Sequence, residues 1–331
     1  MPGAAPDDTF VPRIKELAAA LHAHGAKLAC QTGYVTLVSW QGVQQVGPSP
    51  IPSFTNQVTP RALTITEIET IVEAWGEAAL RIQSAGADAV EIQAAHGYFL
   101  SAFLSPFRNR RTDQYGGSLQ NRARFTCEVI QRVRQKVGAD FPILIRMNGS
   151  DYLEGGLSSD ESALLAQMFV AVGVDAIDVS VATQDSRQWR DLSYLYPDGA
   201  IVPLAAAIKK SVTVPVIAVG KIGNIALADQ IIRDGKADFV AMGRGLLAEP
   251  ALLNKTIENR LDEIHGCIYC NNCRLDRTAQ DGTHRRGIAC TVNPALGRER
   301  GFQITSAGTS KKVTVIGGGL AGCWAAYRAS E

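Results

Sequence analysis

The sequence has no long hydrophobic run and no strong excess of charge of either sign. Lys and Arg together number 33 and Asp and Glu 32, which leaves a formal net charge of +1. This balance gives no reason to expect nucleic acid or an anionic membrane surface as a partner. No stretch reaches the roughly 20 apolar residues of a membrane span, and the N-terminus lacks the basic start and apolar run of a secretory signal. These absences predict a cytoplasmic protein that binds neither nucleic acid nor membrane.

Cysteine is scarce, and most of it is concentrated in one short segment. The chain of 331 residues has seven cysteines, of which four lie between Cys267 and Cys290. In a chain without an export signal, this crowding favours a bound metal or cluster over disulfides. Disorder is also excluded, because apolar residues make up 46% of the chain and charged residues 20%, a composition that can bury a core.

One pattern recurs along the chain: an amphipathic stretch, a turn with glycine and a short apolar run. The turns at 85–88, 172–175 and 235–238 read AGAD, VGVD and GKAD. Glycine accepts the left-handed conformation that ends a helix, and the apolar runs suit buried parallel strands. Strands alternating with helices predict a parallel α/β fold, either a barrel or a doubly wound sheet. The predicted strands are 28–30, 89–92, 142–146, 176–179, 214–219 and 239–242, and the predicted helices include 65–84, 119–137 and 159–172.

The cysteine segment has a spacing typical of an iron–sulfur cluster. Two residues separate Cys267 from Cys270, two more separate Cys270 from Cys273, and Cys290 follows after a longer interval. Four thiolates at this spacing suit a [4Fe–4S] cluster. A structural zinc with four Cys ligands is the alternative. Zinc sites usually present two pairs of cysteines, whereas this segment presents three plus one, so the spacing favours iron and sulfide.

A glycine motif follows further along the chain. A strand is predicted at 313–316, and Gly317, Gly319 and Gly322 come directly after it in the pattern G-x-G-x-x-G. In dinucleotide-binding folds this motif lets a pyrophosphate rest on the N-terminus of the next helix. The acidic residue that contacts the ribose lies roughly 20 residues further on, past Glu331. We therefore expect 311–331 to be the beginning of a truncated dinucleotide-binding domain.

The segment after the strand at 89–92 carries an unusual set of motifs. It reads HGYFL at 96–100, FLSP at 103–106 and NRRTDQYGGS at 109–118. Composition alone is compatible with a long structural loop, but these motifs resemble the signature of the old yellow enzyme family. Members of that family are flavoprotein ene-reductases that bind FMN in an eight-stranded α/β barrel. With the cysteine segment and the glycine motif, the chain resembles the multidomain branch, which holds 2,4-dienoyl-CoA reductases, enoate reductases and trimethylamine dehydrogenase.

The resemblance implies a TIM (β/α)8-type barrel that lacks its first two β/α units. Family members begin with two strands and their helices before the region that matches Phe10 to Gln31. The implied organisation is an N-terminally incomplete FMN-binding barrel at 1–262, an iron–sulfur segment at 263–308 and the start of an FAD/NAD(P)-binding domain at 311–331. A closed barrel of this type has eight strands in about 250 residues. We therefore expect six strands to leave open edges and to bind FMN weakly or not at all.

The resemblance also assigns roles at the end of the strand at 89–92. Tyr98 matches a tyrosine that donates a proton to the substrate, and a phenol held in a dry site can act as such an acid. His96 fills the second place of the substrate-binding pair and is predicted to be catalytic with Tyr98. Gln93 fills the first place, where many members have histidine. A Gln amide can donate to a carbonyl oxygen but carries no positive charge.

The flavin contacts follow in the same way. Gln31 matches a residue that bonds the pyrimidine edge of the ring, which needs both a donor and an acceptor. Arg146 matches the cation beside flavin N1 and O2, where hydride uptake builds negative charge. The phosphate is expected at the last two strand-to-helix turns of the barrel, where glycines admit backbone amides and a cation neutralises the charge. The residues of these turns are Gly220, Lys221, Gly243 and Arg244.

Together these residues predict a flavin- and [4Fe–4S]-dependent oxidoreductase that reduces an activated C=C bond of a small unsaturated substrate. In intact relatives, electrons pass from NAD(P)H through FAD and the cluster to FMN. The loop at 181–189 lacks the histidine that dienoyl-CoA reductases carry there, and Asp185 near its place is a substrate-binding candidate. The alternatives are an amine dehydrogenase or demethylase of the trimethylamine dehydrogenase type, and a non-catalytic fragment. The oligomeric state stays open, a homo-oligomer included.

Overall fold

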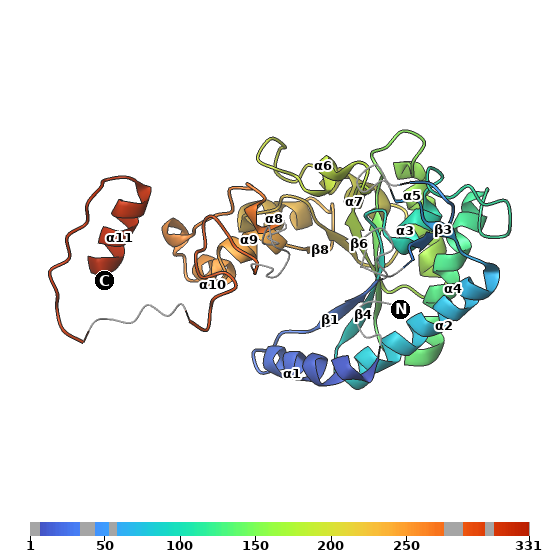
Figure 1. Cartoon of the computed structure of the whole chain (residues 1–331), viewed down its shortest axis with the longest axis horizontal. Coiled ribbons are helices and arrows are strands. Elements are labelled where there is room, and N and C mark those ends of the chain that lie inside the picture. The colour runs from blue at the N-terminus through green and yellow to red at the C-terminus, as the bar shows by residue number, and fades with distance from the viewer. Residues whose placement is uncertain (1–6, 34–43, 53–57, 275–286, 302–307, 331) are drawn as a thin grey trace. The chain divides into compact units, whose positions relative to one another are not determined.

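The computed structural model describes residues 7–33, 44–52, 58–274, 287–301 and 308–330 (Figure 1). The chain divides into two compact units, Met1–Asn271 and Asn272–Glu331. The division falls inside the predicted iron–sulfur segment, so Cys267 and Cys270 belong to the first unit and Cys273 and Cys290 to the second. Among the described residues, no helix is both long and apolar enough to cross a bilayer.

A six-stranded parallel sheet runs through the first unit (Figure 1). Its order is β1-β4-β5-β6-β7-β8, so the strands of this sheet lie side by side in the order in which they occur in the sequence. This sequential order is that of a TIM-barrel-type sheet, because a doubly wound sheet reverses its order at a switch point. The sheet is open in the described residues, with β1 and β8 at its edges. The strand bounds are β1 Ala29–Thr32, β4 Ala89–Ala94, β5 Ile143–Asn148, β6 Ala176–Ser180, β7 Val216–Ala218 and β8 Phe239–Val240.

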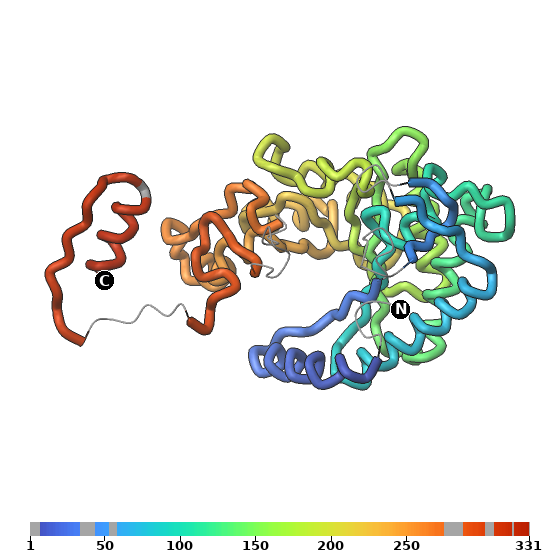
Figure 2. The backbone as a smooth tube through the Cα atoms, in the orientation of Figure 1, coloured from blue at the N-terminus to red at the C-terminus, as the bar shows by residue number. Residues whose placement is uncertain are grey.

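Helices connect the strands in turn, and Figure 2 traces this alternation along the backbone. The predicted helices are confirmed at α2, α4 and α5, and polar residues fix where they begin. Thr64 and Glu67 form a reciprocal capping box at the start of α2, and Ser158 and Glu161 form another at the start of α5, which satisfies backbone N–H groups that a helix leaves unpaired. The helices of the first unit are η1 Asp8–Phe10, α1 Val11–His22, α2 Ile65–Ser84, α3 Phe99–Leu104, α4 Leu119–Val137, α5 Ser159–Ala171, α6 Arg187–Arg190, α7 Val202–Lys209, α8 Ile225–Arg233, α9 Gly243–Ala248, α10 Leu252–Ile257 and η2 Leu261–Glu263.

The aspartates of the repeated turns fix the starts of the strands. The carboxylate of Asp88 accepts from the backbone N–H of Leu28 at 2.8 Å, and that of Asp175 accepts from Ile143 at 2.7 Å. Asp238 accepts from Val216 in the same way at 2.9 Å. Each aspartate precedes one strand and bonds the first residues of the strand before it, so the repeated motif sets the register between neighbouring strands.

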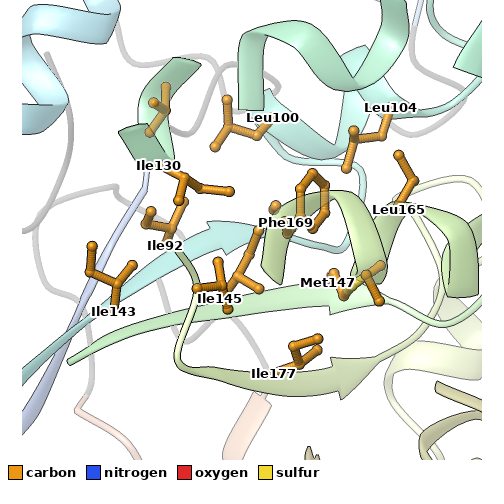
Figure 3. Packing of buried hydrophobic residues seen from close by; sticks show 14 of the residues in the cluster. Ile92, Leu100, Leu104, Ile130, Ile143, Ile145, Met147, Leu165, Phe169 and Ile177 are labelled. Carbon is orange, nitrogen blue, oxygen red and sulfur yellow. The ribbon is translucent and has the colours of Figure 1, made fainter. Parts of the chain in front are cut away.

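The core lies between the sheet and its helices (Figure 3). Ile92, Ile145 and Ile177 project from β4, β5 and β6 toward Phe169 and Leu165 of α5. All five side chains are fully buried. Successive side chains of a strand point to opposite faces of a sheet, so the residues that follow these isoleucines, Gln93, Arg146 and Asp178, lie on the other face. The apolar alternation of the strands thus places polar residues away from the helices.

Two local predictions are wrong. The segment after β4 is more than a loop, because residues 99–104 form the short helix α3, whose side chains are all buried. Residues 313–316 form no strand in the described part of the second unit, and Ile316 is 96% exposed. A strand requires a hydrogen-bonded neighbour, and the described residues of this unit supply none. The structure also contains a short parallel pair that was not predicted, β2 Val46–Gly47 and β3 Arg61–Ala62.

The second unit contains η3 Asn272–Arg274 and the helix α11 Leu320–Ser330. The glycine motif leads directly into α11. Gly317 has a φ of +107°, and a Cβ added to Gly322 would lie 1.8 Å from the Gly317 carbonyl oxygen. Both positions therefore require glycine, one for its backbone conformation and one for close contact. The predicted motif has the tight turn that a dinucleotide-binding loop uses, although its preceding strand is not formed.

Candidate active site

The candidate site is built at the carboxyl ends of β4, β5 and β6. Gln93 of β4 lies opposite Arg146 of β5, and Arg146 lies opposite Asp178 of β6. These three residues form a polar row on the face of the sheet that the helices do not cover. Active sites of (β/α) barrels lie at this end of the strands. The sheet register alone therefore brings two predicted site residues together.

Arg146 is held by an acidic environment that its sequence position does not reveal. Its Nη1 lies 3.4 Å from Oδ2 of Asp178, and its buried Nε has no hydrogen-bond partner in the part of the chain that the structure describes. Burial raises the pKa of Asp178 to about 7, while the nearby Arg146 opposes this rise and Glu91 adds to it. Oδ1 of Asp178 likewise has no partner among these residues. Arg146 thus keeps unsatisfied hydrogen-bonding capacity on the open face of the sheet, where an acceptor can use it.

The raised pKa makes a prediction about stability and pH. Because the unfolded chain ionises Asp178 near its ordinary pKa of 3.8 and the folded chain only near 7, the wild type should lose stability as pH rises through this window. Asp178→Asn abolishes this dependence, so its unfolding free energy relative to wild type should rise by about 3–4 kcal/mol from pH 4 to pH 8, at about 1.36 kcal/mol per pKa unit. Denaturant titrations at several pH values measure the difference.

The control is Asp238→Asn, since bonds to Lys209 and to the backbone of Val216 lower the pKa of Asp238. Its stabilising effect is present above the unfolded pKa of 3.8 and is lost as pH falls below it. The unfolding free energy of this variant relative to wild type should therefore change little from pH 4 to pH 8 and rise only at lower pH. Parallel pH profiles for wild type and Asp178→Asn would contradict the raised pKa.

His96 and Tyr98 lie at the turn between β4 and α3. Nε2 of His96 is 2.7 Å from the hydroxyl of Ser180, and its backbone N–H donates to Asn148 at 3.0 Å. Tyr98 is half-buried at the N-cap of α3, and its ring meets the His96 ring edge to face, with 5.9 Å between centroids. Gly97 between them has a φ of +69°, and a Cβ there would approach Thr183 at 3.0 Å. The turn therefore presents both predicted catalytic side chains together.

The two predicted amide contacts, Gln31 and Gln93, are bonded to each other. Nε2 of Gln93 donates to Oε1 of Gln31 at 3.2 Å, and Oε1 of Gln93 accepts from the backbone of Ala95 at 2.9 Å. The Gln31 amide in turn donates to Glu91. Gln93 is buried and Gln31 exposed. Each amide is thus oriented by its neighbours, and Gln31 retains exposure on β1 for a further contact.

Asp185 is engaged inside the protein. Its carboxylate pairs with Arg108, and both side chains are almost fully buried. Arg108 also donates to the carbonyls of Ile51 and Pro52, at 3.1 and 2.8 Å. The ion pair between Asp185 and Arg108 therefore links the loop after β6 to the segment that contains Ile51 and Pro52. A contact between Asp185 and substrate stays a prediction.

An aromatic cluster that the sequence analysis missed lies in the loops after β5 and β6. Tyr152 stacks on Trp189, with 4.3 Å between ring centroids and 17° between the planes. Trp189 also contacts Tyr196, with 5.0 Å between ring centroids. Tyr152 is distant from the other two along the chain, so only folding brings the three rings together. The cluster offers a π surface that can contact flat or cationic groups.

The two predicted phosphate turns lie side by side. A Cβ added to Gly245 would lie 3.5 Å from the Cα of Gly223, which joins the turn after β7 to the turn after β8. Gly220 has a φ of +106°, and a Cβ there would overlap Ile201 at 2.2 Å. Lys221 and Arg244 are contributed by these turns, and Gly243 begins α9. The sequence prediction that Gly220, Lys221, Gly243 and Arg244 share one region therefore agrees with the structure.

The predicted cluster cysteines are divided between the two units. In the first unit, the Cys267 sulfur accepts the backbone N–H of Tyr269 at 3.4 Å. In the second, the Cys290 sulfur accepts that of Val292 at the same distance. Backbone N–H···S bonds suit thiolates that hold iron and sulfide. Among the described residues no group of three or more His, Cys, Asp or Glu side chains forms a metal site, so the cluster stays a prediction.

Comparison with known proteins shows the family of the chain. The sequence description of the NADH:flavin oxidoreductase / NADH oxidase family matches residues 4–263, which covers most of the chain. The chain belongs to this family. The expected resemblance is therefore confirmed, and FMN is the cofactor that family membership supports.

Named relatives and a solved structure are similar to nearly the whole chain. The chain is 41% identical to the NADH oxidase of Thermoanaerobacter brockii over 98% of this chain and 50% of the relative. It is 37% identical to the cinnamate reductase of Clostridium sporogenes over 96% of this chain and 50% of that one. The structure of a 2-naphthoyl-CoA reductase complex aligns with a TM-score of 0.86 and 29% identity, over 96% of this chain and 50% of that chain. The chain thus spans about half the length of these proteins.

The residues present suit the flavin that the family uses. Among the described residues, the buried Nε of Arg146 at the strand ends and the hydroxyl of Tyr269 beside the two glycine turns have no hydrogen-bond partner. Flavin oxygens and a phosphate are acceptors of the kind that such donors require. Asp178, Glu91 and Tyr269 were missed from the sequence. Asp178 and Glu91 could have been found from the sequence, because each is a charged residue in an otherwise apolar strand. Each also alternates along its strand with residues of the core face.

Proposed function

We propose that this chain carries the FMN-binding and alkene-reducing part of a flavin- and [4Fe–4S]-dependent oxidoreductase. The proposed substrate is an enoate, enone or enoyl thioester, and NAD(P)H is the proposed source of electrons. The observation that supports this is the placement of Tyr98 and His96 at the end of β4, beside the row Gln93–Arg146–Asp178. The relatives named cinnamate reductase and 2-naphthoyl-CoA reductase support a substrate with a conjugated acid or thioester.

The residues divide the chemistry among themselves. FMN, when bound, supplies the hydride. Arg146 offers an N–H donor and a positive charge to the flavin edge on which negative charge develops. Gln93 and His96 are the proposed donors to the substrate carbonyl, and the bond between His96 and Ser180 orients the imidazole. Tyr98 provides the phenolic proton for the carbon next to the site of reduction.

In the proposed function, the cysteine segment and the glycine motif serve the delivery of electrons to the FMN site. Cys267, Cys270, Cys273 and Cys290 are the proposed cluster ligands. Gly317, Gly319 and Gly322 are the proposed start of the FAD- or NAD(P)H-binding part, because Gly317 and Gly322 adopt the tight turn such a loop needs. A cluster held by these four cysteines would supply one-electron transfer between the proposed flavin sites.

The experiment is a spectrum followed by a turnover assay. FMN added to the purified chain should bind saturably, and acid extraction of the loaded protein should release FMN. Chemically reduced protein mixed anaerobically with cinnamate or cyclohexenone should be reoxidised, with the saturated product recovered. Arg146→Leu should lower FMN content, whereas Arg187→Leu, an exposed arginine of α6, is the matched control. Bound FMN with no reoxidation by any alkene would contradict the proposed reaction while leaving the flavin site intact.

A second candidate function is oxidation of a methylated or primary amine, and the aromatic cluster favours it. Tyr152, Trp189 and Tyr196 form a π surface on loops at the same end of the strands as Tyr98. Such surfaces attract ammonium groups through the ring quadrupole. Reduction of the bound flavin by trimethylamine or dimethylglycine, without reoxidation by alkenes, would favour this function over alkene reduction.

A further inference from the structure

Tyr269 connects the cysteine segment with the two phosphate turns. Its ring lies beneath two cations, with 4.9 Å from the ring centroid to Nζ of Lys221 and 4.9 Å to Cζ of Arg244. Lys221 comes from the turn after β7 and Arg244 from the turn after β8. The negative face of an aromatic ring attracts such cations. Tyr269 therefore holds both turns to the segment that contains Cys267 and Cys270.

The hydroxyl of Tyr269 ends at the junction of the turns. A Cβ added to Gly223 would lie 2.0 Å from this oxygen, so only glycine leaves room for it. Gly245 of the other turn lies beside Gly223. The Tyr269 residue is 8% exposed, and its hydroxyl has no hydrogen-bond partner among the described residues. A buried hydroxyl without a partner loses its bonds to water and gains nothing in return, unless a ligand accepts a hydrogen bond from it.

The charges around this hydroxyl favour an anionic ligand. Lys221 donates to the carbonyl of Tyr196 and lies 3.2 Å from Asp198, an acidic group that is half exposed. Arg244 donates through Nη1 to the carbonyl of Leu192 and to the side chain of Asn271. A guanidinium has five N–H donors, so these two bonds leave Arg244 with capacity for another acceptor. Lys221, Arg244 and the Tyr269 hydroxyl thus lie together at the junction of the turns. The carboxylate of Asp198 lies beside Lys221.

We propose that Tyr269 donates its hydroxyl hydrogen bond to the 5′-phosphate of FMN. This inference rests on the flavin site of the proposed function and extends it, because it makes the cysteine segment part of the FMN site. The arrangement has a consequence for assembly. Loss of the bonds that hold Cys267 and Cys270 should loosen the phosphate end of the flavin, because Tyr269 lies between these cysteines in the sequence.

The test compares FMN with riboflavin, which has the same ring but no phosphate. Tyr269→Phe keeps the ring beneath Lys221 and Arg244 and removes only the hydroxyl oxygen. Hydrogen bonds to charged groups suggest that FMN should bind roughly 10- to 100-fold more weakly, with riboflavin binding unchanged. Fluorescence quenching of each flavin measures both constants. Tyr115→Phe is the matched control, because its buried hydroxyl bonds to Glu128, away from the turns, and should alter neither constant.

Inorganic phosphate separates this inference from the proposed function. Phosphate should raise the melting temperature of the wild type more than that of Tyr269→Phe, whether or not FMN binds. A chain that responds to phosphate through Tyr269 but binds neither flavin would support the anion site and contradict the flavin function. Equal or tighter FMN binding by Tyr269→Phe, or an equal response of both proteins to phosphate, would overturn the role of Tyr269.

Discussion

Tyr98→Phe is expected to slow the reoxidation of reduced flavin by an activated alkene by about 10²–10⁴-fold, the usual cost of removing a positioned general acid. The phenyl ring preserves the edge-to-face contact with His96, and the backbone of Tyr98 still caps α3. FMN content should therefore stay equal to that of wild type. Anaerobic stopped-flow measurement of flavin reoxidation by cinnamate separates the chemical step from flavin binding.

Tyr194→Phe provides the control for this experiment. Tyr194 is 69% exposed, so loss of its hydroxyl should change neither the rate nor the flavin content. Solvent deuterium should slow the wild type more than Tyr98→Phe, because only the wild type transfers a proton from an internal acid. An unchanged reoxidation rate in Tyr98→Phe would exclude Tyr98 as the proton donor.

Cys270→Ala is expected to remove the iron–sulfur cluster entirely. Anaerobically purified wild type should contain about four iron and four sulfide per chain, and the variant should contain neither, because three thiolates cannot complete the ligand set. The segment that contains Cys267 and Cys270 should also become less ordered, since metal binding and local folding are coupled. Iron and sulfide assays, with the visible spectrum, measure the loss.

Cys323→Ala is the matched cysteine variant, because Cys323 is exposed on α11 and stands outside the proposed ligand set. It should retain full iron and sulfide. One zinc and no sulfide in the wild type would instead establish the structural zinc alternative. If Tyr269 does join this segment to the phosphate turns, Cys270→Ala should also weaken FMN binding more than riboflavin binding.

The chain spans about half the length of its relatives. In the proposed function, the described residues supply the alkene site and the turns for the flavin phosphate. The source of electrons, the ribose partner of the glycine motif and the choice between NADH and NADPH belong to the proposal for the whole protein. Assays with chemically reduced chain avoid this dependence, because they require only the first unit and its FMN.

The sequence by itself determined the six strands of the main sheet, its longer helices and the family. The predicted bounds of α2 and α4 agree with the structure, because their apolar periodicity and capping residues such as Thr64 and Ser118 act over a single turn of helix. The repeated Gly and Asp turns predicted parallel strands for the same local reason. The motifs around His96 and Tyr98 then indicated the family, and the match at 4–263 confirmed it.

Only the tertiary structure decided which strands are neighbours and what surrounds each site residue. Sequential strand order separated the barrel type from a doubly wound sheet, a difference that local pattern cannot encode. Register placed Asp178 beside Arg146, and folding of distant loops joined Arg108 to Asp185 and Tyr152 to Trp189. Local rules govern residues a few positions apart, whereas burial, pKa shifts and unsatisfied donors such as the Tyr269 hydroxyl depend on chain segments that only folding brings together.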